Sequence, residues 1–245
     1  MPCCPVCSSQ QSELFIVHTA GDCIRCLDCN LVWLEPPPQQ DAIEHLYADA
    51  YHDATTGYFT KVDRKLARSI GRVRQIRAYL RRDPHGLQFL DVGANGGFMC
   101  EAARRAGFEV TGVEPDAHAI HWAQQHYPNI RFVNSFIEHA DLDPESFDVA
   151  YCSEVIEHSP NCRAFVAAIS RTMRLGGLLY ITTPNISHWR RPGDITKWVG
   201  FNPPAHCVYF SPNNLTQLLA NCGLRVVRNR WAFKPGIKLI ARREE

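Results

Sequence analysis

The chain has 245 residues, with 26 lysines and arginines against 25 aspartates and glutamates and a formal net charge of +1. At roughly 100–200 residues per domain, this length fits one large domain with a small appendage. The near-neutral charge excludes a chain-wide electrostatic field for holding nucleic acid or an anionic membrane. We therefore expect a small-molecule partner and do not expect a nucleic-acid partner.

The chain has no run of about 18 apolar residues, and its first residues lack the charged and apolar regions of a signal peptide. We expect a cytoplasmic protein without membrane insertion. Six of the eleven cysteines lie before residue 30. In a reducing compartment, this clustering is typical of metal ligands rather than of a disulfide framework.

The N-terminal cysteines form two Cys-x-x-Cys knuckles whose separation is within the range of a zinc ribbon. A segment this short needs a metal to fold. We predict a Zn²⁺ site with the ligands Cys4, Cys7, Cys26 and Cys29. Cys23 also lies three positions from Cys26 and competes with Cys29. Four thiolates leave no open position on the metal, which favours a structural role.

A triple proline at residues 36–38 ends this predicted module, residues 1–38. Residues 39–85 are predicted to be a helical linker or cap, with two or three helices broken near Gly57. Seven arginines make its last helix, residues 60–82, basic. Such a run is typical of a solvated face, and an anionic acceptor is the functional alternative.

From residue 86 onward, short apolar runs alternate with helical stretches, which is typical of βαβ units around a parallel sheet. The last two predicted strands are joined by a loop short enough for a hairpin, so one strand should be antiparallel. We predict an α/β Rossmann-like domain over residues 86–245, with a seven-stranded, mostly parallel sheet whose last strand is antiparallel. The predicted strands are residues 88–92, 109–114, 131–134, 147–152, 177–182, 224–232 and 237–242.

A glycine-rich turn follows the first of these strands, with Asp91, Gly93 and Gly97 in order and helical sequence after it. Glycines permit positive φ and close approach to a ligand, and a helix N-terminus offers free N–H groups. The next strand ends in Glu114, roughly 20 positions further on, where an acid can accept hydrogen bonds from ribose hydroxyls. This order of features indicates a nucleotide-containing cofactor.

With the Glu-Val-Ile-Glu-His motif at residues 154–158, these features resemble class I S-adenosylmethionine-dependent methyltransferases over about residues 86–230. More narrowly they resemble the ubiquinone-biosynthesis O-methyltransferase-like branch. The resemblance implies S-adenosylmethionine, with its amino-acid part at the glycine turn, its ribose at the acid, and its adenine beside the residues after the third strand. The cofactor-binding residues expected from it are Asp91, Gly93, Asn95, Gly97, Glu114, Ser135, Phe136 and Ser153.

Asn95 departs from the family pattern, which has a glycine there, but asparagine tolerates the left-handed conformation. The alternative, a fold of this kind that binds NAD, would want glycine at that position and leaves the later motifs unexplained. Residues 26–38 resemble the ribbon fused before bacterial methyltransferases of this type. That likeness favours Cys29 over Cys23.

Two histidines are candidate bases for removing a proton from the methyl acceptor, since histidine titrates near neutral pH. His158 follows the fourth strand, and its alternative role is to shape the loop or the cofactor pocket. His206 lies at the end of a long connection, residues 184–210, that we expect to cover the acceptor as a lid. Its alternative role is to tie this loop to the following helix.

We expect an enzyme that methylates a small molecule, at oxygen, in a specialised-metabolite or cell-surface glycan pathway. One alternative is an RNA methyltransferase that uses the ribbon to contact RNA. Another is a zinc-ribbon protein that senses the cofactor without turnover. The sequence leaves open the acceptor, which histidine acts as the base, the role of the ribbon and the oligomeric state.

Overall fold

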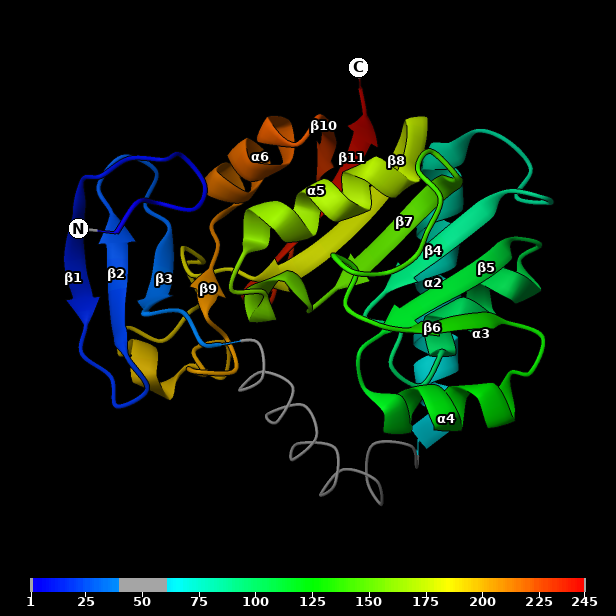
Figure 1. The fold of residues 1–245 in the computed structure, drawn as a ribbon, viewed down its shortest axis with the longest axis horizontal. Helices are drawn as coiled ribbons and strands as arrows, with labels where there is room; N and C mark the ends of the chain where they lie inside the picture. Colours follow the sequence, from blue (N-terminus) through cyan, green and yellow to red (C-terminus); the bar gives the residue numbers. More distant parts are fainter. Residues whose placement is uncertain (1, 40–60, 245) are drawn as a thin grey trace.

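The computed structural model describes residues 2–39 and 61–244 and contains a large sheet and a small one (Figure 1). The large sheet has seven strands, and all seven lie where the sequence predicts them. They are β4 (Gln88–Val92), β5 (Glu109–Glu114), β6 (Arg131–Asn134), β7 (Phe147–Ser153), β8 (Met173–Pro184), β10 (Leu224–Asn229) and β11 (Gly236–Arg243).

The strands of the large sheet follow the order β10-β11-β8-β7-β4-β5-β6. The pairs from β8 to β6 are parallel, whereas β11 runs antiparallel to both β8 and β10. The predicted Rossmann-like sheet with an antiparallel last strand is therefore confirmed. Successive strands step outward from β4 to β6, and the chain then returns to β7 on the other side of β4. This reversal creates a switch point where ligands of open α/β sheets bind.

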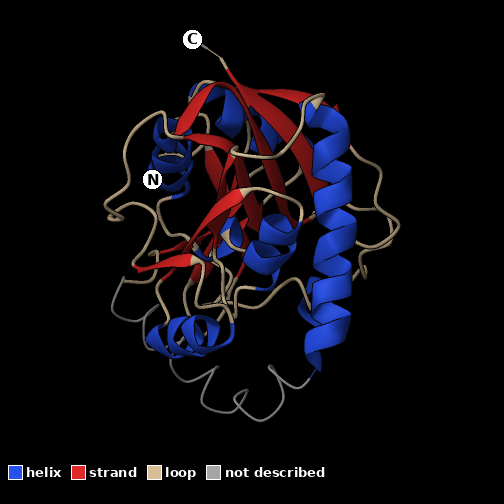
Figure 2. Cartoon of the chain, turned by 90° about the vertical axis from the view of Figure 1, so that its right-hand side faces the viewer, coloured by secondary structure: helices blue, strands red, loops and turns tan. Residues whose placement is uncertain are grey.

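Helices cover both faces of the large sheet, and Figure 2 shows the sheet between them. Side chains alternate between the faces along each strand. Phe89 and Tyr151 pack with the helices α2 (Val62–Leu80) and α3 (Phe98–Arg105), and Leu90 and Cys152 pack with helices of the opposite face. The helices of that face are α5 (Cys162–Thr172) and α6 (Pro212–Asn221). A further helix, α4 (Ala117–His126), lies beside β6.

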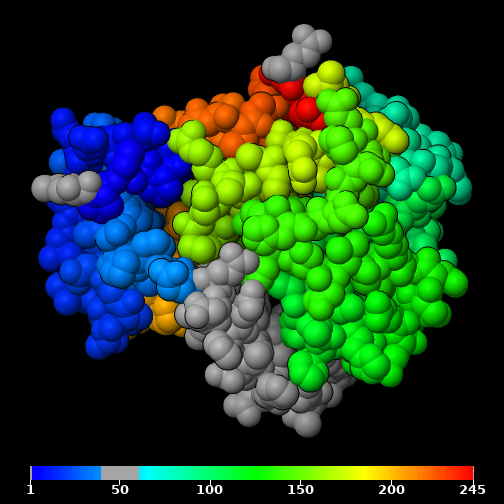
Figure 3. Space-filling view, in the orientation of Figure 1, coloured from blue at the N-terminus to red at the C-terminus, as the bar shows by residue number. Residues whose placement is uncertain are grey.

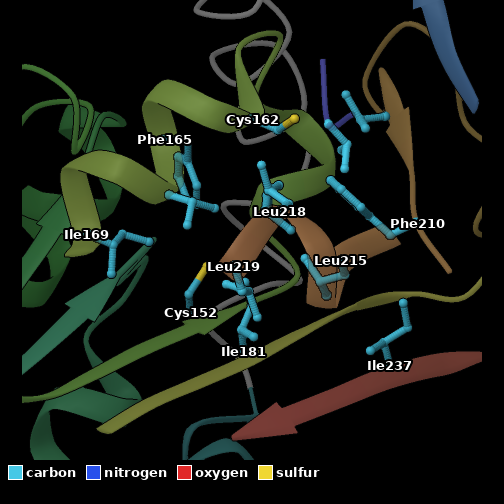
Figure 4. Close-up of a cluster of buried hydrophobic side chains, with 14 of the residues drawn as sticks. Cys152, Cys162, Phe165, Ile169, Ile181, Phe210, Leu215, Leu218, Leu219 and Ile237 are labelled. Atoms are coloured by element: carbon cyan, nitrogen blue, oxygen red, sulfur yellow. The ribbon is translucent and has the colours of Figure 1, made fainter. Parts of the chain in front are cut away.

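The apolar core under α5 and α6 is drawn in Figure 4, where Phe165 and Leu219 point toward Cys152 and Ile181 of the sheet. Ser211 caps α6 in a reciprocal capping box with Asn214. The core continues into the N-terminal module, since its buried cysteines and β-strand residues belong to the same cluster. No boundary of apolar packing separates the two parts among the described residues.

The small sheet contains β1 (Ser12–Ile16), β2 (Asp22–Cys26), β3 (Val32–Glu35) and β9 (Val208–Tyr209) in that order. Its fourth strand, β9, comes from a distant part of the chain, because 172 residues separate the end of β3 at residue 35 from the start of β9 at residue 208. In Figure 3 the blue N-terminal module forms a continuous surface with the orange and yellow-green atoms of α6 and α5.

The predicted helices over residues 41–60 lie outside the described residues, whereas α2 agrees with the last predicted helix. Among the helices that the structure describes, none combines the length and the apolar character needed to cross a bilayer.

Candidate active site

The glycine turn lies at the carboxyl end of β4, beside the switch point. Gly93, Asn95 and Gly97 all have positive φ, at 75°, 47° and 73°. The N–H groups of Gly93 and Ala94 donate to the carbonyl oxygen of Val113 at 2.9 and 3.0 Å, which ties the turn to β5. Asn95 thus adopts the left-handed conformation expected of it.

Gly93 and Gly97 of this turn leave room for neighbouring side chains. A Cβ on Gly93 would lie 2.4 Å from Cγ2 of Val155, and one on Gly97 would lie 2.8 Å from Cζ of Phe132. Val155 belongs to the loop after β7. Hence the glycine turn and the loop that carries His158 are in direct contact, and the predicted cofactor residues adjoin a predicted base.

Two buried acids flank the turn. Glu114 is 4% exposed and accepts hydrogen bonds from the N–H groups of Asn95 at 2.9 Å and Asp116 at 3.1 Å. Burial raises the pKa of Glu114 and of Asp91 to about 7. Each carboxylate oxygen of Glu114 can accept a second bond, so ribose hydroxyls fit this acid. The positive-φ turn and the buried acids together suit S-adenosylmethionine.

The other expected cofactor residues surround the same strand ends. Ser135 follows β6 and donates its hydroxyl to the carbonyl oxygen of Phe136 at 2.9 Å, and both side chains are half-buried. Ser153 ends β7, and its Oγ lies 2.8 Å from Oγ1 of Thr182. The structure places these residues at the expected edge of the sheet. Their contacts with a cofactor stay predictions.

Arg72 of α2 lies beside predicted cofactor residues, although the sequence does not single it out. Its guanidinium donates to the hydroxyl of Tyr151 and, at 3.3 Å, to Oγ of Ser153. Its positive charge also counteracts part of the rise in the pKa of Asp91 that burial causes. Arg72 is one of seven arginines on its predicted helix. It differs from the others in that it faces the end of β7 at Ser153, which the sequence pattern does not reveal. A guanidinium beside the glycine turn suits the carboxylate of an amino-acid moiety.

His158 and His206, proposed separately from the sequence, lie side by side. Their ring centroids are 4.6 Å apart and the rings are nearly perpendicular, at 83°. Nδ1 of His158 lies 2.7 Å from the carbonyl oxygen of Ala205, and Nδ1 of His206 lies 2.9 Å from that of Gly200. A carbonyl oxygen only accepts, so each Nδ1 carries the proton and each Nε2 keeps the lone pair.

Burial keeps both imidazoles neutral. It lowers the pKa of His158 to about 4, helped by the neighbouring His206, and it lowers the pKa of His206 as well. Two adjacent rings cannot both hold a proton without repulsion. Both rings are therefore unprotonated at neutral pH, and each has a lone pair on Nε2.

Glu157 completes this cluster, although the sequence gives it no role. Its Oε2 accepts the hydroxyl of Thr183 at 2.8 Å, while its Oε1 is buried without a hydrogen-bond partner among the described residues. Burial, reinforced by the charge of Glu154, raises the pKa of Glu157 to about 8. One possible ligand atom each from Glu157, His158 and His206 lies within 4.8 Å of the others, a set that could also hold a metal ion.

The predicted zinc ligands come together at the end of the N-terminal module. The four Sγ atoms of Cys4, Cys7, Cys26 and Cys29 lie within 4.8 Å of one another, and the Cys4–Cys29 and Cys7–Cys26 pairs are 3.5 Å apart. Tetrahedral Zn–S bonds of about 2.3 Å would place the sulfurs about 3.8 Å apart, so this donor set fits Zn²⁺. Cys23 lies on β2 outside the cluster.

A family model described as a methyltransferase domain matches residues 58–229, well over half of the sequence. The chain therefore belongs to this methyltransferase family, and the predicted class of enzyme is confirmed at that level. Two relatives are named Ubiquinone biosynthesis O-methyltransferase. The one from Erwinia tasmaniensis is 28% identical over 62% of this chain and 71% of its own. The one from Glaesserella parasuis is 32% identical over 44% of this chain and 51%, about half, of its own length.

A solved structure with the same fold is that of 1,6-didemethyltoxoflavin-N1-methyltransferase from Burkholderia thailandensis, with bound 1,6-didemethyltoxoflavin and S-adenosylhomocysteine. It superposes with a TM-score of 0.62 over 96% of this chain and 100% of that chain, at 16% identity. At this identity the likeness concerns the fold. The acceptor must be argued from the site itself.

Proposed function

We propose that this methyltransferase moves a methyl group from S-adenosylmethionine to an oxygen atom of a small-molecule acceptor, with the His158–His206 pair as the base. The observation that carries the proposal is the contact between the two halves of the site. Val155 packs against Gly93 of the cofactor turn, and the same loop continues into His158. A proton acceptor therefore stands next to the predicted place of the methyl donor.

When bound, S-adenosylmethionine supplies an electrophilic methyl group. The chain then has to align the acceptor and take the hydroxyl proton as the new C–O bond forms. Neutral imidazoles whose Nδ1–H groups are held by the carbonyl oxygens of Ala205 and Gly200 present Nε2 for this task. Arg72 and Glu114 would hold the carboxylate and the ribose of the donor.

Two further observations support a small acceptor rather than a polymer. The whole chain carries a formal charge of only +1. The connection that carries His206 has Trp198 and Phe201 buried, and its carbonyl oxygens at Gly200 and Ala205 accept hydrogen bonds from the two histidines. Buried aromatic side chains at this position suit a compact, partly apolar acceptor. A specialised-metabolite or cell-surface glycan precursor fits these features.

To test this proposal, the protein and labelled S-adenosylmethionine are incubated with fractionated small-molecule extracts. The labelled product is then identified by mass spectrometry. With that acceptor, His158→Asn and His206→Asn should each slow methyl transfer by about 10²–10⁴-fold and leave the Kd of S-adenosylmethionine nearly unchanged. Glu114→Ala should have the opposite pattern and weaken cofactor binding in calorimetry.

Unchanged rates in both histidine variants would exclude the pair as the base. Unchanged cofactor affinity in Glu114→Ala would refute the ribose assignment. Label in RNA but in no small molecule would favour the RNA methyltransferase instead, and cofactor binding without any labelled product would favour a sensor.

A further inference from the structure

The zinc-ribbon sheet contains a strand that belongs to the acceptor half of the site. β3 pairs antiparallel with β9, with Val32 opposite Tyr209 and Trp33 opposite Val208. The N–H of Leu34 also donates to the carbonyl oxygen of Cys207 at 2.8 Å. The segment just after His206 is thus an edge strand of the ribbon.

The same segment is bonded to the histidine cluster on its other side. The N–H of Cys207 donates to the carbonyl oxygen of Glu157 at 2.9 Å. The hydroxyl of Tyr209 donates to the carbonyl oxygen of His206 at 2.6 Å, and Ala205 accepts from His158. The main chain around His206 is held between β3 and the short helix η2 (Ile156–His158), which carries the other histidine.

The predicted metal knuckles lead directly to these contacts. The N–H of Cys26 donates to the carbonyl oxygen of Leu31 at 2.9 Å, so the second knuckle folds back immediately before β3. Asn214 of α6 donates to the carbonyl oxygen of Cys29 at 3.3 Å. A second route runs through His18 of the ribbon, whose ring lies edge-on to Phe201 at 6.1 Å, and Phe201 stacks on Tyr209 at 5.1 Å.

The contacts of the predicted cofactor residues with other described residues lie within the large domain. The turn at Gly93 is tied to Val113 and Val155, and Glu114 is tied to Asn95 and Asp116. None of these partners belongs to the ribbon. The ribbon therefore contacts the part of the predicted active site that contains the two histidines.

We propose that the four-cysteine metal centre is a positioning element for the His158–His206 pair, acting through β3 and β9, with Tyr209 as the positioning residue. Loss of the metal releases the segment around His206 and leaves the cofactor turn intact. The inference that this matters for methyl transfer rests on the proposed function. The structural coupling itself can be measured without an acceptor.

The experiment compares the intact chain loaded with zinc and the same chain after chelation. It also includes the variants Cys26→Ser and Tyr209→Phe. The control is Cys3→Ser, because the thiol of Cys3 lies outside the four-sulfur cluster. Amide hydrogen exchange reports on Cys207, NMR of the imidazole C–H groups reports on the two histidines, and calorimetry gives the Kd of S-adenosylmethionine. Metal loss should speed exchange at Cys207 by at least about tenfold and shift both histidine signals. The Kd should stay within about twofold.

Tyr209→Phe keeps the zinc and should shift the His206 signal without changing the exchange of the knuckle amides, whereas Cys3→Ser should match the native protein in every measurement. The proposal is overturned if metal loss leaves the exchange rate at Cys207 and the histidine signals unchanged. It is also overturned if metal loss raises the Kd of S-adenosylmethionine beyond the expected range. A confirmed coupling in a protein that methylates no acceptor would instead refute the proposed function alone.

Discussion

Glu157 shows how one residue's chemistry depends on its surroundings. It shares a five-residue motif with Glu154, yet Glu154 is exposed and Glu157 is 1% exposed. Burial raises the pKa of Glu157 to about 8, so its carboxyl group is mostly protonated near neutral pH. In this form it accepts the hydrogen bond of the Thr183 hydroxyl without adding a charge beside the histidine pair.

Glu157→Gln should change how stability depends on pH. The folded-state pKa of about 8 lies above the ordinary value of 4.5, so the folded protein holds this proton more tightly than the unfolded chain does. The contribution is fully present below about pH 4.5 and is lost as pH rises toward 8. Glutamine does not titrate. The free energy of unfolding of the native protein should therefore fall relative to that of the variant by up to about 1.4 kcal/mol per pH unit within this window.

Urea unfolding at several pH values between 5 and 8 measures this difference. Glu154→Gln serves as the companion variant, because removing the neighbouring charge should move the window to lower pH. Parallel pH profiles for the native protein and Glu157→Gln would show that the buried carboxyl group ionises as an ordinary one.

At the scale of elements, packing against the loop after β7 constrains the glycine turn. Gly86 and Gly93 have nearly the same positive φ, 76° and 75°. A Cβ on Gly86 would meet nothing within 4 Å, whereas one on Gly93 would lie 2.4 Å from Val155. The two positions separate the cost of backbone conformation from the cost of a clash.

Gly86→Ala should lower the free energy of unfolding by about 1 kcal/mol, the cost of a left-handed alanine. Gly93→Ala should lower it by about 3 kcal/mol or more, because the alanine also displaces the loop that carries His158. It should weaken S-adenosylmethionine binding too. Denaturant unfolding and calorimetry test both expectations. An equal loss of unfolding free energy in the two variants would mean that the loop after β7 moves to accommodate the new Cβ at little energetic cost.

At the scale of the whole molecule, side chains from the helices α5 and α6 of the large domain bind the ribbon. Arg163 of α5 donates to the carbonyl oxygens of Val6 at 2.8 Å and Pro5 at 3.4 Å. Asn221 of α6 donates to that of Val6 at 3.0 Å. These bonds fix the first knuckle, while β9 fixes the third ribbon strand.

Arg163→Ala should therefore lower the free energy of unfolding by about 1 kcal/mol, a modest value because the side chain is partly in solvent. Arg171→Ala, on the same helix and exposed, is the matched control and should change stability by less than about 0.5 kcal/mol. Equal effects in urea unfolding would indicate that the ribbon contributes nothing to stability through this contact.

Much of the fold could be predicted because its signals are local. Apolar runs defined all seven strands of the large sheet, and the short connection near residue 235 indicated the antiparallel pair. The glycine turn, Glu114 and the two cysteine knuckles were recognisable because each depends on residues a few positions apart. The placement of these residues in the structure agrees with those local patterns.

The sequence by itself thus determined the seven strands of the large sheet, the glycine turn and the cysteine set. Only the tertiary structure decided that His158 and His206 form one pair, that β9 completes the ribbon sheet, and that Arg72 faces β7. These features join residues that are 48 to 177 positions apart in the chain. Such contacts arise from sheet order and helix packing, which local periodicity does not encode.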